Sequence, residues 1–203
     1  MELTAMQKDV IAEVSNIGFN RAAGALSMLL AKRVRLQSPA LSFYRMDELE
    51  RLLLPGMEKE VTTVHQIFSG AISGNALLLL GGDSASVLVD LLTGGSGKAH
   101  RMNVSDREAL VEVGNILLNA YLGTFGNMLK VQISFTVPHL RVDDINQIFN
   151  SLVVGEITVH YVLVISTEFA MENGSVSGKI ILMMGIESLE ALLAAIDKMN
   201  LNA

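Results

Sequence analysis

Apolar residues recur every three or four positions in two long stretches of the chain, residues 4–31 and 105–129. This spacing is typical of an amphipathic helix that buries one stripe of side chains. The predicted buried stripes contain Val10, Ile11, Val14, Ile17, Ala22, Ala25 and Leu29 in the first helix, and Ala109, Leu110, Val113, Ile116, Leu117 and Ala120 in the second. Ser105 and Glu108 have the spacing of a capping box, which predicts a helix start at Ser105.

Shorter apolar runs follow each of these helices. Residues 61–68 and 153–169 are rich in β-branched side chains, which favours strands. Residues 76–80 and 180–184 are almost wholly apolar, and their length is typical of buried strands. Residues 84–92 and 188–199 show a helical pattern again. We therefore expect an α+β fold, in which helices pack on a largely antiparallel sheet.

The second half of the chain repeats the first. The segment Glu13–Ile17 matches Glu112–Ile116 at an offset of 99 positions, and two of the three prolines, Pro39 and Pro138, have the same offset. Two αβββα-like halves, about 1–98 and 99–203, are therefore expected to form a single domain with a pseudo-twofold axis. The run Gly94-Gly95-Ser96-Gly97 between them is typical of a linker.

A polar stripe is repeated as well. Asp9, Glu13 and Asn16 fall within about 60° of one another around the first helix, on the side away from the apolar stripe. The corresponding residues of the second helix are Glu108, Glu112 and Asn115. A single Glu-x2-Asn on a helix is usually plain solvated surface. Here asparagine, a mediocre helix former, recurs within both helices, which favours a function over chance, with duplication of the segment alone as the other explanation.

The chemistry offered by these side chains is narrow. A carboxylate can pair with a lysine or arginine of another protein, and a carboxamide both donates and accepts, so it can orient a water molecule. Neither group is a good nucleophile, and neither set contains His, Ser or Cys. We therefore expect the two sets to position a water for attack on an electrophile that a partner protein supplies.

Composition argues against several other classes of function. The 203 residues include no cysteine, which excludes disulfides, thiolate metal sites and cysteine nucleophiles. The net charge of −6 argues against nucleic acid as a partner. The segment Gly94–Lys98 lacks the first glycine and the final Ser or Thr of a phosphate-binding loop. No apolar run is long enough to span a bilayer and the start does not resemble a signal peptide, so a cytoplasmic location is expected.

The repeated residues resemble the motif of the CheC family of chemotaxis phosphatases, [Asp/Ser]-x3-Glu-x2-Asn-x22-Pro. The first copy is Asp9, Glu13, Asn16 and Pro39, and the second is Glu108, Glu112, Asn115 and Pro138, with Glu108 in place of the usual Asp or Ser. Chain length and the presence of two copies resemble CheC more than CheX. Without an extra C-terminal domain, a flagellar switch component like FliY is not expected.

The resemblance implies a function and assigns roles. Proteins of this family dephosphorylate the phosphoaspartate of the response regulator CheY. By resemblance, Asn16 and Asn115 would position the attacking water and Glu13 and Glu112 would pair with the regulator's active-site lysine. Asp9, Glu108, Pro39 and Pro138 would be supporting positions. The family's magnesium is held by the regulator, so no cofactor is expected on this chain, and the deamidase CheD is a further candidate partner.

Two alternatives stay open at this point. The same scaffold suits a non-catalytic module that docks a response regulator or a flagellar switch protein, although such a module need not keep Glu and Asn in both copies. A structural homodimer without a regulator partner is the other. The identity of the regulator, the activity of each copy and the oligomeric state are not specified by these patterns.

Overall fold

The elements of the computed structural model follow the repeated order expected from the sequence. The structure describes residues 3–37, 40–45, 48, 59–148, 161–171 and 174–201. The first half contains α1 (Ala5–Leu30), β1 (Arg35–Leu36), β2 (Ala40–Arg45), β3 (Glu60–Gly70), β4 (Gly74–Gly81) and α3 (Ser84–Thr93). The second half contains α4 (Val104–Leu129), β5 (Ile133–Phe135), β6 (His139–Asp144), β7 (Tyr161–Met171), β8 (Gly174–Met184) and α6 (Ile186–Leu201).

Each half contributes four strands to the described part of the sheet, not the three expected. The proline-bearing strand of each half is divided: β1 ends at Leu36 and β2 begins at Ala40, while β5 ends at Phe135 and β6 begins at His139. Pro138 lies in the second gap and is buried. A proline has no backbone N–H for a ladder hydrogen bond, which accounts for the interruption there. Pro39 lies outside the described residues.

All strand pairs in this sheet are antiparallel, as expected. Its eight described strands follow the order β1-β7-β8-β4-β3-β5, and β2 and β6 pair in addition with β7 and β3. The first two strands of each half therefore pair with the long hairpin of the other half. The pairing pattern is unchanged when the two halves are exchanged, as a pseudo-twofold axis would require, and the axis itself stays a prediction.

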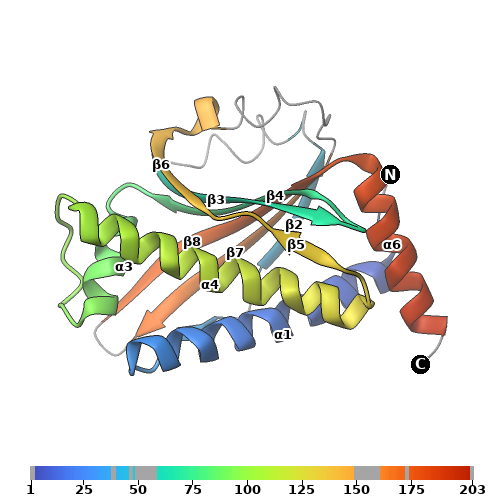
Figure 1. The fold of residues 1–203 in the computed structure, drawn as a ribbon, viewed down its shortest axis with the longest axis horizontal. Helices are drawn as coiled ribbons and strands as arrows, with labels where there is room; N and C mark the ends of the chain where they lie inside the picture. Colours follow the sequence, from blue (N-terminus) through green and yellow to red (C-terminus); the bar gives the residue numbers. More distant parts are fainter. Residues whose placement is uncertain are drawn as a thin grey trace.

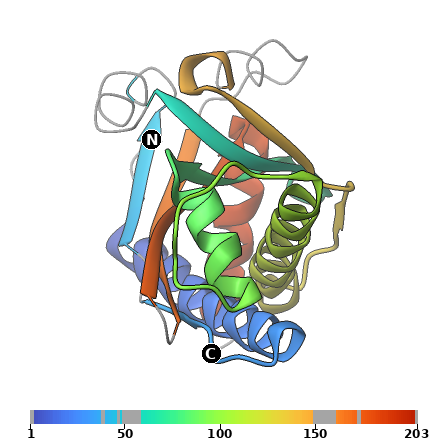
Figure 2. The same ribbon diagram turned by 90° about the vertical axis from the view of Figure 1, so that its left-hand side faces the viewer.

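The helices cover one face of the sheet. Figure 1 shows α1 and α4 side by side in front of the strands and running in opposite directions, with α3 and α6 towards opposite ends. Figure 2 shows the sheet bent around these helices, from β2 and β7 to β3 and β6. The main core fills the space between sheet and helices, and a second buried cluster that includes Leu77, Ile181 and Met183 lies on the other face of the sheet. Both faces of the central strands are therefore buried, which explains why they are apolar throughout.

The caps define the ends of the long helices. Thr4 and Gln7 form a capping box at the start of α1. The second helix begins one residue earlier than expected, because Asn103 and Asp106 form its capping box and Ser105 with Glu108 does not. Most of the expected apolar stripes are at least partly buried, but Leu29, in the last turn of α1, is 55% exposed. Leu26, one turn earlier, is fully buried.

The glycine-rich segment between α3 and α4 folds around a carboxylate of its own chain. The backbone N–H groups of Gly97 and Lys98 donate to Asp90 Oδ2 at 2.8 and 3.0 Å, and these hydrogen bonds lower the pKa of Asp90. A Cβ on Gly95 would lie 2.2 Å from the same carboxylate, so a larger residue there would force the Asp90 side chain to move. The segment thus connects α3 to α4, and the N–H groups of Gly94, Gly95, Gly97 and Lys98 are engaged internally.

In the part of the chain that the structure describes, no helix combines the length and the apolar character needed to cross a bilayer.

Candidate functional site on two adjacent helices

The first copy of the motif lies on the outward side of α1. Asp9 and Glu13 are exposed, and Asn16 is half-buried. On the opposite side of the helix, Ile11 and Val14 are almost completely buried in the main core. Among the described residues, the Asn16 side chain has no hydrogen-bond partner. Its carboxamide is therefore available to a partner or a water molecule in either orientation.

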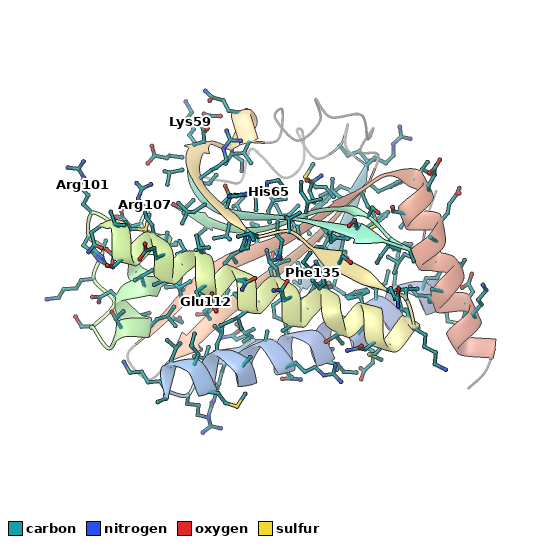
Figure 3. The ribbon with its side chains drawn as sticks, viewed as in Figure 1. Lys59, His65, Arg101, Arg107, Glu112 and Phe135 are labelled. Carbon is teal, nitrogen blue, oxygen red and sulfur yellow. The ribbon has the colours of Figure 1, made fainter. Side chains whose placement is uncertain are left out.

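The second copy presents the same groups on α4. Glu108 and Glu112 are exposed and Asn115 is half-buried. Figure 3 shows Glu112 on this helix, in the outer layer of the molecule. Here the asparagine has a partner, because Asn119 Nδ2 donates to Asn115 Oδ1 at 2.7 Å. The expected exposure of the motif is thus met fully by the glutamates and partly by the asparagines, and the assigned roles stay predictions.

A buried glutamine extends the second copy into the core. Gln66 on β3 is 1% exposed, and its Nε2 donates to Asn119 Oδ1 at 3.1 Å and to the backbone oxygen of Thr136 at 2.8 Å. Asn119 in turn donates to Asn115. A continuous chain of hydrogen bonds therefore connects the sheet to the motif asparagine on α4.

The Glu-x2-Asn motif does not include Gln66 or Asn119, although the sequence contains part of the signal for this extension. Asn20 and Asn119 are also 99 positions apart, and each lies four residues after the motif asparagine. Residues four apart share a helix face, so the repeated pattern is Glu-x2-Asn-x3-Asn in both copies. Gln66 has no such signal, because only the packing of α4 on β3 brings it to Asn119.

A glycine allows α4 to approach the sheet closely. A Cβ on Gly114 would lie 2.5 Å from Val64 Cγ1 on β3, two residues before Gln66 on the same face of that strand. The corresponding residue of α1 is Ser15, which is fully buried and whose Oγ donates to the Ile11 backbone oxygen at 2.6 Å. α1 packs mainly against α4 and makes few contacts with β7, the strand that corresponds to β3.

The two helices meet at a tyrosine. Tyr121 of α4 is 1% exposed, and its hydroxyl lies 2.8 Å from Ser15 Oγ of α1. Its ring packs edge-on against Phe19, and a Cβ on Gly18 would lie 3.0 Å from Tyr121 Cδ2. Burial raises the pKa of Tyr121, and the hydrogen bond to Ser15 only partly offsets that rise. This contact holds the two motif-bearing helices in a defined position relative to each other.

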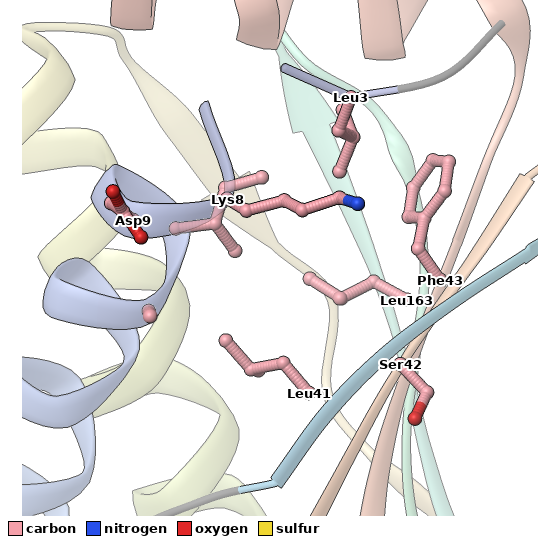
Figure 4. A pocket seen from close by; sticks show the side chains of 9 residues that line it. Leu3, Lys8, Asp9, Leu41, Ser42, Phe43 and Leu163 are labelled. Atoms are coloured by element: carbon pink, nitrogen blue, oxygen red, sulfur yellow. The ribbon is translucent and has the colours of Figure 1, made fainter. Parts of the chain in front are cut away.

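A small apolar cavity adjoins the first copy. It has a volume of about 380 Å³ and lies between the start of α1 and strand β2. Figure 4 shows Leu41, Phe43 and Leu163 facing Lys8 and Leu3, with Asp9 at the edge. The cavity therefore lies beside the motif without reaching Glu13 or Asn16.

The chain is similar to two curated proteins of Bacillus subtilis, and no family model matches it. It is 26% identical to the CheY-P phosphatase CheC over 144 residues, which are 68% of this chain and 66% of that protein. It is 22% identical to the flagellar motor switch phosphatase FliY over 148 residues, 72% of this chain and 38% of FliY. The matched region is thus less than two thirds of either relative. These similar identities do not favour CheC over FliY.

Solved structures show that the fold is shared. The crystal structure of FliY from Thermotoga maritima matches 98% of this chain and 100% of its own with a TM-score of 0.77 at 21% identity. FliM from Helicobacter pylori, in a complex with FliG, matches 95% of this chain and all of its own with a TM-score of 0.65 at 13% identity. The repeated Glu and Asn motif, the curated relatives and the fold together confirm the resemblance of this chain to the CheC family.

Proposed function

We propose that this chain dephosphorylates a response regulator of the CheY class that carries a phosphoaspartate. The supporting observation is the outward polar stripe that occurs twice, with a carboxylate and a carboxamide one helical turn apart on α1 and again on α4. CheC, whose similarity covers 68% of this chain, is named a CheY-P phosphatase. In this proposal, the activity, the substrate and the partner of this chain are inferred from the name of CheC.

The chemistry requires little of this chain beyond orientation. A water oxygen attacks the phosphorus atom, the bond to the aspartate oxygen breaks, and the products are inorganic phosphate and a free aspartate carboxylate. Asn16 or Asn115 would hold the water in line with that bond, and Glu13 or Glu112 would pair with the regulator's lysine. Orientation of a reactant accounts for large rate effects because it removes translational and rotational freedom before the reaction step.

The metal ion of the reaction belongs to the regulator in this proposal. Aspartyl phosphate transfer is assisted by a divalent cation that neutralises charge on the phosphoryl oxygens. The described residues include no group of three His, Asp or Glu that would hold such an ion. The Glu and Asn of each motif copy are a poor donor set for magnesium, which prefers several oxygen ligands in an octahedral arrangement. The proposed regulator also implies a cytoplasmic location; CheD as a partner stays a prediction.

A second function is favoured by the structural matches to FliM. One of those structures is a FliG–FliM complex, so this fold occurs in a flagellar protein assembly. The corresponding proposal is a non-catalytic module that docks a regulator or a switch protein. It differs from the phosphatase in one measurable respect, because the module would bind without turnover.

The test is a phosphate-release assay with phosphorylated response regulators. Wild-type chain should accelerate release, and the Asn16→Ala/Asn115→Ala protein should bind the regulator but not accelerate release. Wild-type binding without any release would instead support the docking module. If the chain neither bound nor dephosphorylated any response regulator of the same genome, both the phosphatase and the docking module would be refuted.

A further inference from the structure

The hydrogen bonds behind Asn115 have a defined direction. Gln66 Nε2 lies within hydrogen-bond distance of two acceptors, Thr136 O at 2.8 Å and Asn119 Oδ1 at 3.1 Å. The buried Gln66 Oε1 has no hydrogen-bond partner among the described residues. Turning the Gln66 amide over would place its oxygen against both acceptors, so the observed orientation is the one that the surroundings allow.

This direction is passed on to the motif residue. Because Asn119 Oδ1 accepts from Gln66, its Nδ2 faces Asn115 and donates to Asn115 Oδ1 at 2.7 Å. One lone pair of Asn115 Oδ1 is thereby engaged. Within the described part of the chain, the second lone pair and both N–H groups of Asn115 have no partner, so they are available in a fixed orientation to a water molecule or a phosphoryl oxygen.

The first copy lacks this support because the residue on the sheet differs. His65 of β3 pairs with His139 of β6. In the other half, Ser166 of β7 pairs with Ala40 of β2, which lies 99 positions before His139. Ser166 thus corresponds to His65, and the residues that follow them correspond too. Thr167 is therefore the counterpart of Gln66. It donates to the Gln37 backbone oxygen at 3.1 Å, the equivalent of the bond from Gln66 to Thr136.

Thr167 keeps the anchor on the sheet but has no second donor to offer α1. Asn20, the counterpart of Asn119, is exposed, and its side chain has no hydrogen-bond partner among the described residues. Asn16 has none either. The same motif is thus held on α4 and free on α1, with Gln66 as the difference on the sheet.

We propose that Gln66 and Asn119 are positioning residues that fix the orientation of the Asn115 carboxamide, so that the second copy is preorganised for turnover and the first is not. This inference rests on the proposed function. Neither residue touches the substrate in this scheme, since both act through Asn115. Their effect should therefore appear in kcat, because binding of the regulator depends on the exposed glutamates and the surrounding helix surface.

The experiment isolates each copy. Asn16→Ala leaves only the second copy, and in that background Gln66→Leu and Asn119→Ala each remove one step of the hydrogen-bond chain. We expect kcat to fall about tenfold for either substitution while KM changes by no more than about twofold, because orientation and not affinity is lost. Matched controls are Asn20→Ala and Thr167→Val in the Asn115→Ala background, where neither side chain is hydrogen-bonded to Asn16 and kcat should not change.

A second measurement does not depend on activity. Side-chain amide order parameters from NMR should show Asn115 more rigid than Asn16 in the free protein, and Gln66→Leu should lower the value of Asn115 to that of Asn16. Thermal unfolding identifies variants whose fold is disturbed. If a variant is disturbed, the inference is tested by the NMR comparison of Asn115 with Asn16 in the wild type alone.

The outcomes separate the inference from the proposed function. An unchanged kcat in the Asn16→Ala/Gln66→Leu and Asn16→Ala/Asn119→Ala proteins would overturn the inference while the phosphatase stands. Equal losses from these substitutions in both single-copy backgrounds would also overturn it, since that is the effect of general destabilisation. Equal mobility of Asn115 and Asn16 would contradict it on structural grounds. Absence of phosphate release from the wild type and both single-copy proteins would overturn both the phosphatase function and the positioning role of Gln66 and Asn119.

Discussion

The copies of the motif on α1 and α4 have the same spacing but different surroundings. Both present exposed glutamates and a half-buried asparagine. On α4 the asparagine is hydrogen-bonded through Asn119 to a buried glutamine of the sheet, whereas on α1 it has no partner among the described residues. Two copies of one motif can therefore differ in how their asparagine is held, because Gln66, the residue that anchors Asn119, lies on another element.

Packing explains the difference. Gly114 lets α4 approach β3 at Val64, and that approach brings Asn119 within reach of Gln66. In α1 the equivalent position is Ser15, whose hydroxyl is directed to its own helix and to Tyr121. The two sites thus differ at the helix–sheet contact, with Gly114 against Ser15, and on the strand, with Gln66 against Thr167.

Removal of both asparagines should have the largest effect. We expect Asn16→Ala/Asn115→Ala to lower phosphate release by about 100-fold or more, which is the usual cost of removing a group that stabilises the reaction centre. Of the single variants, Asn115→Ala should lose more activity than Asn16→Ala. The free energy of unfolding should fall by no more than about 1.5 kcal/mol, because both side chains are half-buried and only Asn115 loses a hydrogen bond to a described residue. Release assays and denaturant unfolding measure the two effects, and an active double variant would exclude water positioning by these amides.

Charge reversal of the glutamates should weaken docking at each copy separately. Glu13→Lys and Glu112→Lys would place a lysine against the regulator's lysine, and like charges in an interface cost several kcal/mol. In the matching single-copy background, we expect binding of the phosphorylated regulator to weaken by about tenfold or more. The neutral controls Glu13→Gln and Glu112→Gln should lose less, since an exposed ion pair is worth at most about 1 kcal/mol. Unchanged binding after both reversals would show that the interface lies elsewhere.

Two glycine substitutions should have opposite effects on stability. Gly114→Ala would place a Cβ 2.5 Å from Val64, and overpacking of this kind costs about 1–3 kcal/mol in unfolding free energy. Gly24→Ala on α1 meets nothing within 4 Å and should stabilise the protein by about 0.5–1 kcal/mol, since alanine is the better helix former. Gly114→Ala should also reduce turnover by the second copy because it moves α4 away from Gln66. Calorimetry measures the stability of each variant. Equal stabilities of Gly114→Ala and Gly24→Ala would contradict the close approach of α4 to β3.

The contact between α1 and α4 should show the smallest effect and a pH dependence. Tyr121→Phe removes the hydrogen bond to Ser15 and should cost about 1 kcal/mol. Burial raises the pKa of Tyr121 above its ordinary value of 10.0, so the phenol ionises more readily in the unfolded chain. Its contribution to stability is complete below pH 10 and is lost as the pH rises above that value. Melting temperatures between pH 8 and 11 should therefore fall less steeply for Tyr121→Phe than for the wild type, and parallel profiles would exclude this role.

Much of the architecture was accessible from local patterns. The periodicity of apolar residues identified both long helices, the two short helices and the central strands, because an amphipathic element must bury its apolar side wherever it packs. The repeat also predicted that each half would have the same order of elements. The interruption at Pro138 was missed because the strand pattern continues on both sides of the proline. The capping box of α4 was placed at Ser105 instead of Asn103, since both have the required spacing.

The sequence by itself determined the composition of the candidate site, namely which groups α1 and α4 present and at what spacing along each helix. A helix turns by a constant angle per residue, so Glu13 and Asn16 must share a face whatever surrounds them. Only the tertiary structure decided that the two copies differ. Gln66 and Asn119 are 53 positions apart along the chain, and they meet because β3 and α4 pack at the distance that Gly114 permits. Such a contact depends on the summed packing of the whole core, and no periodicity within either segment encodes it.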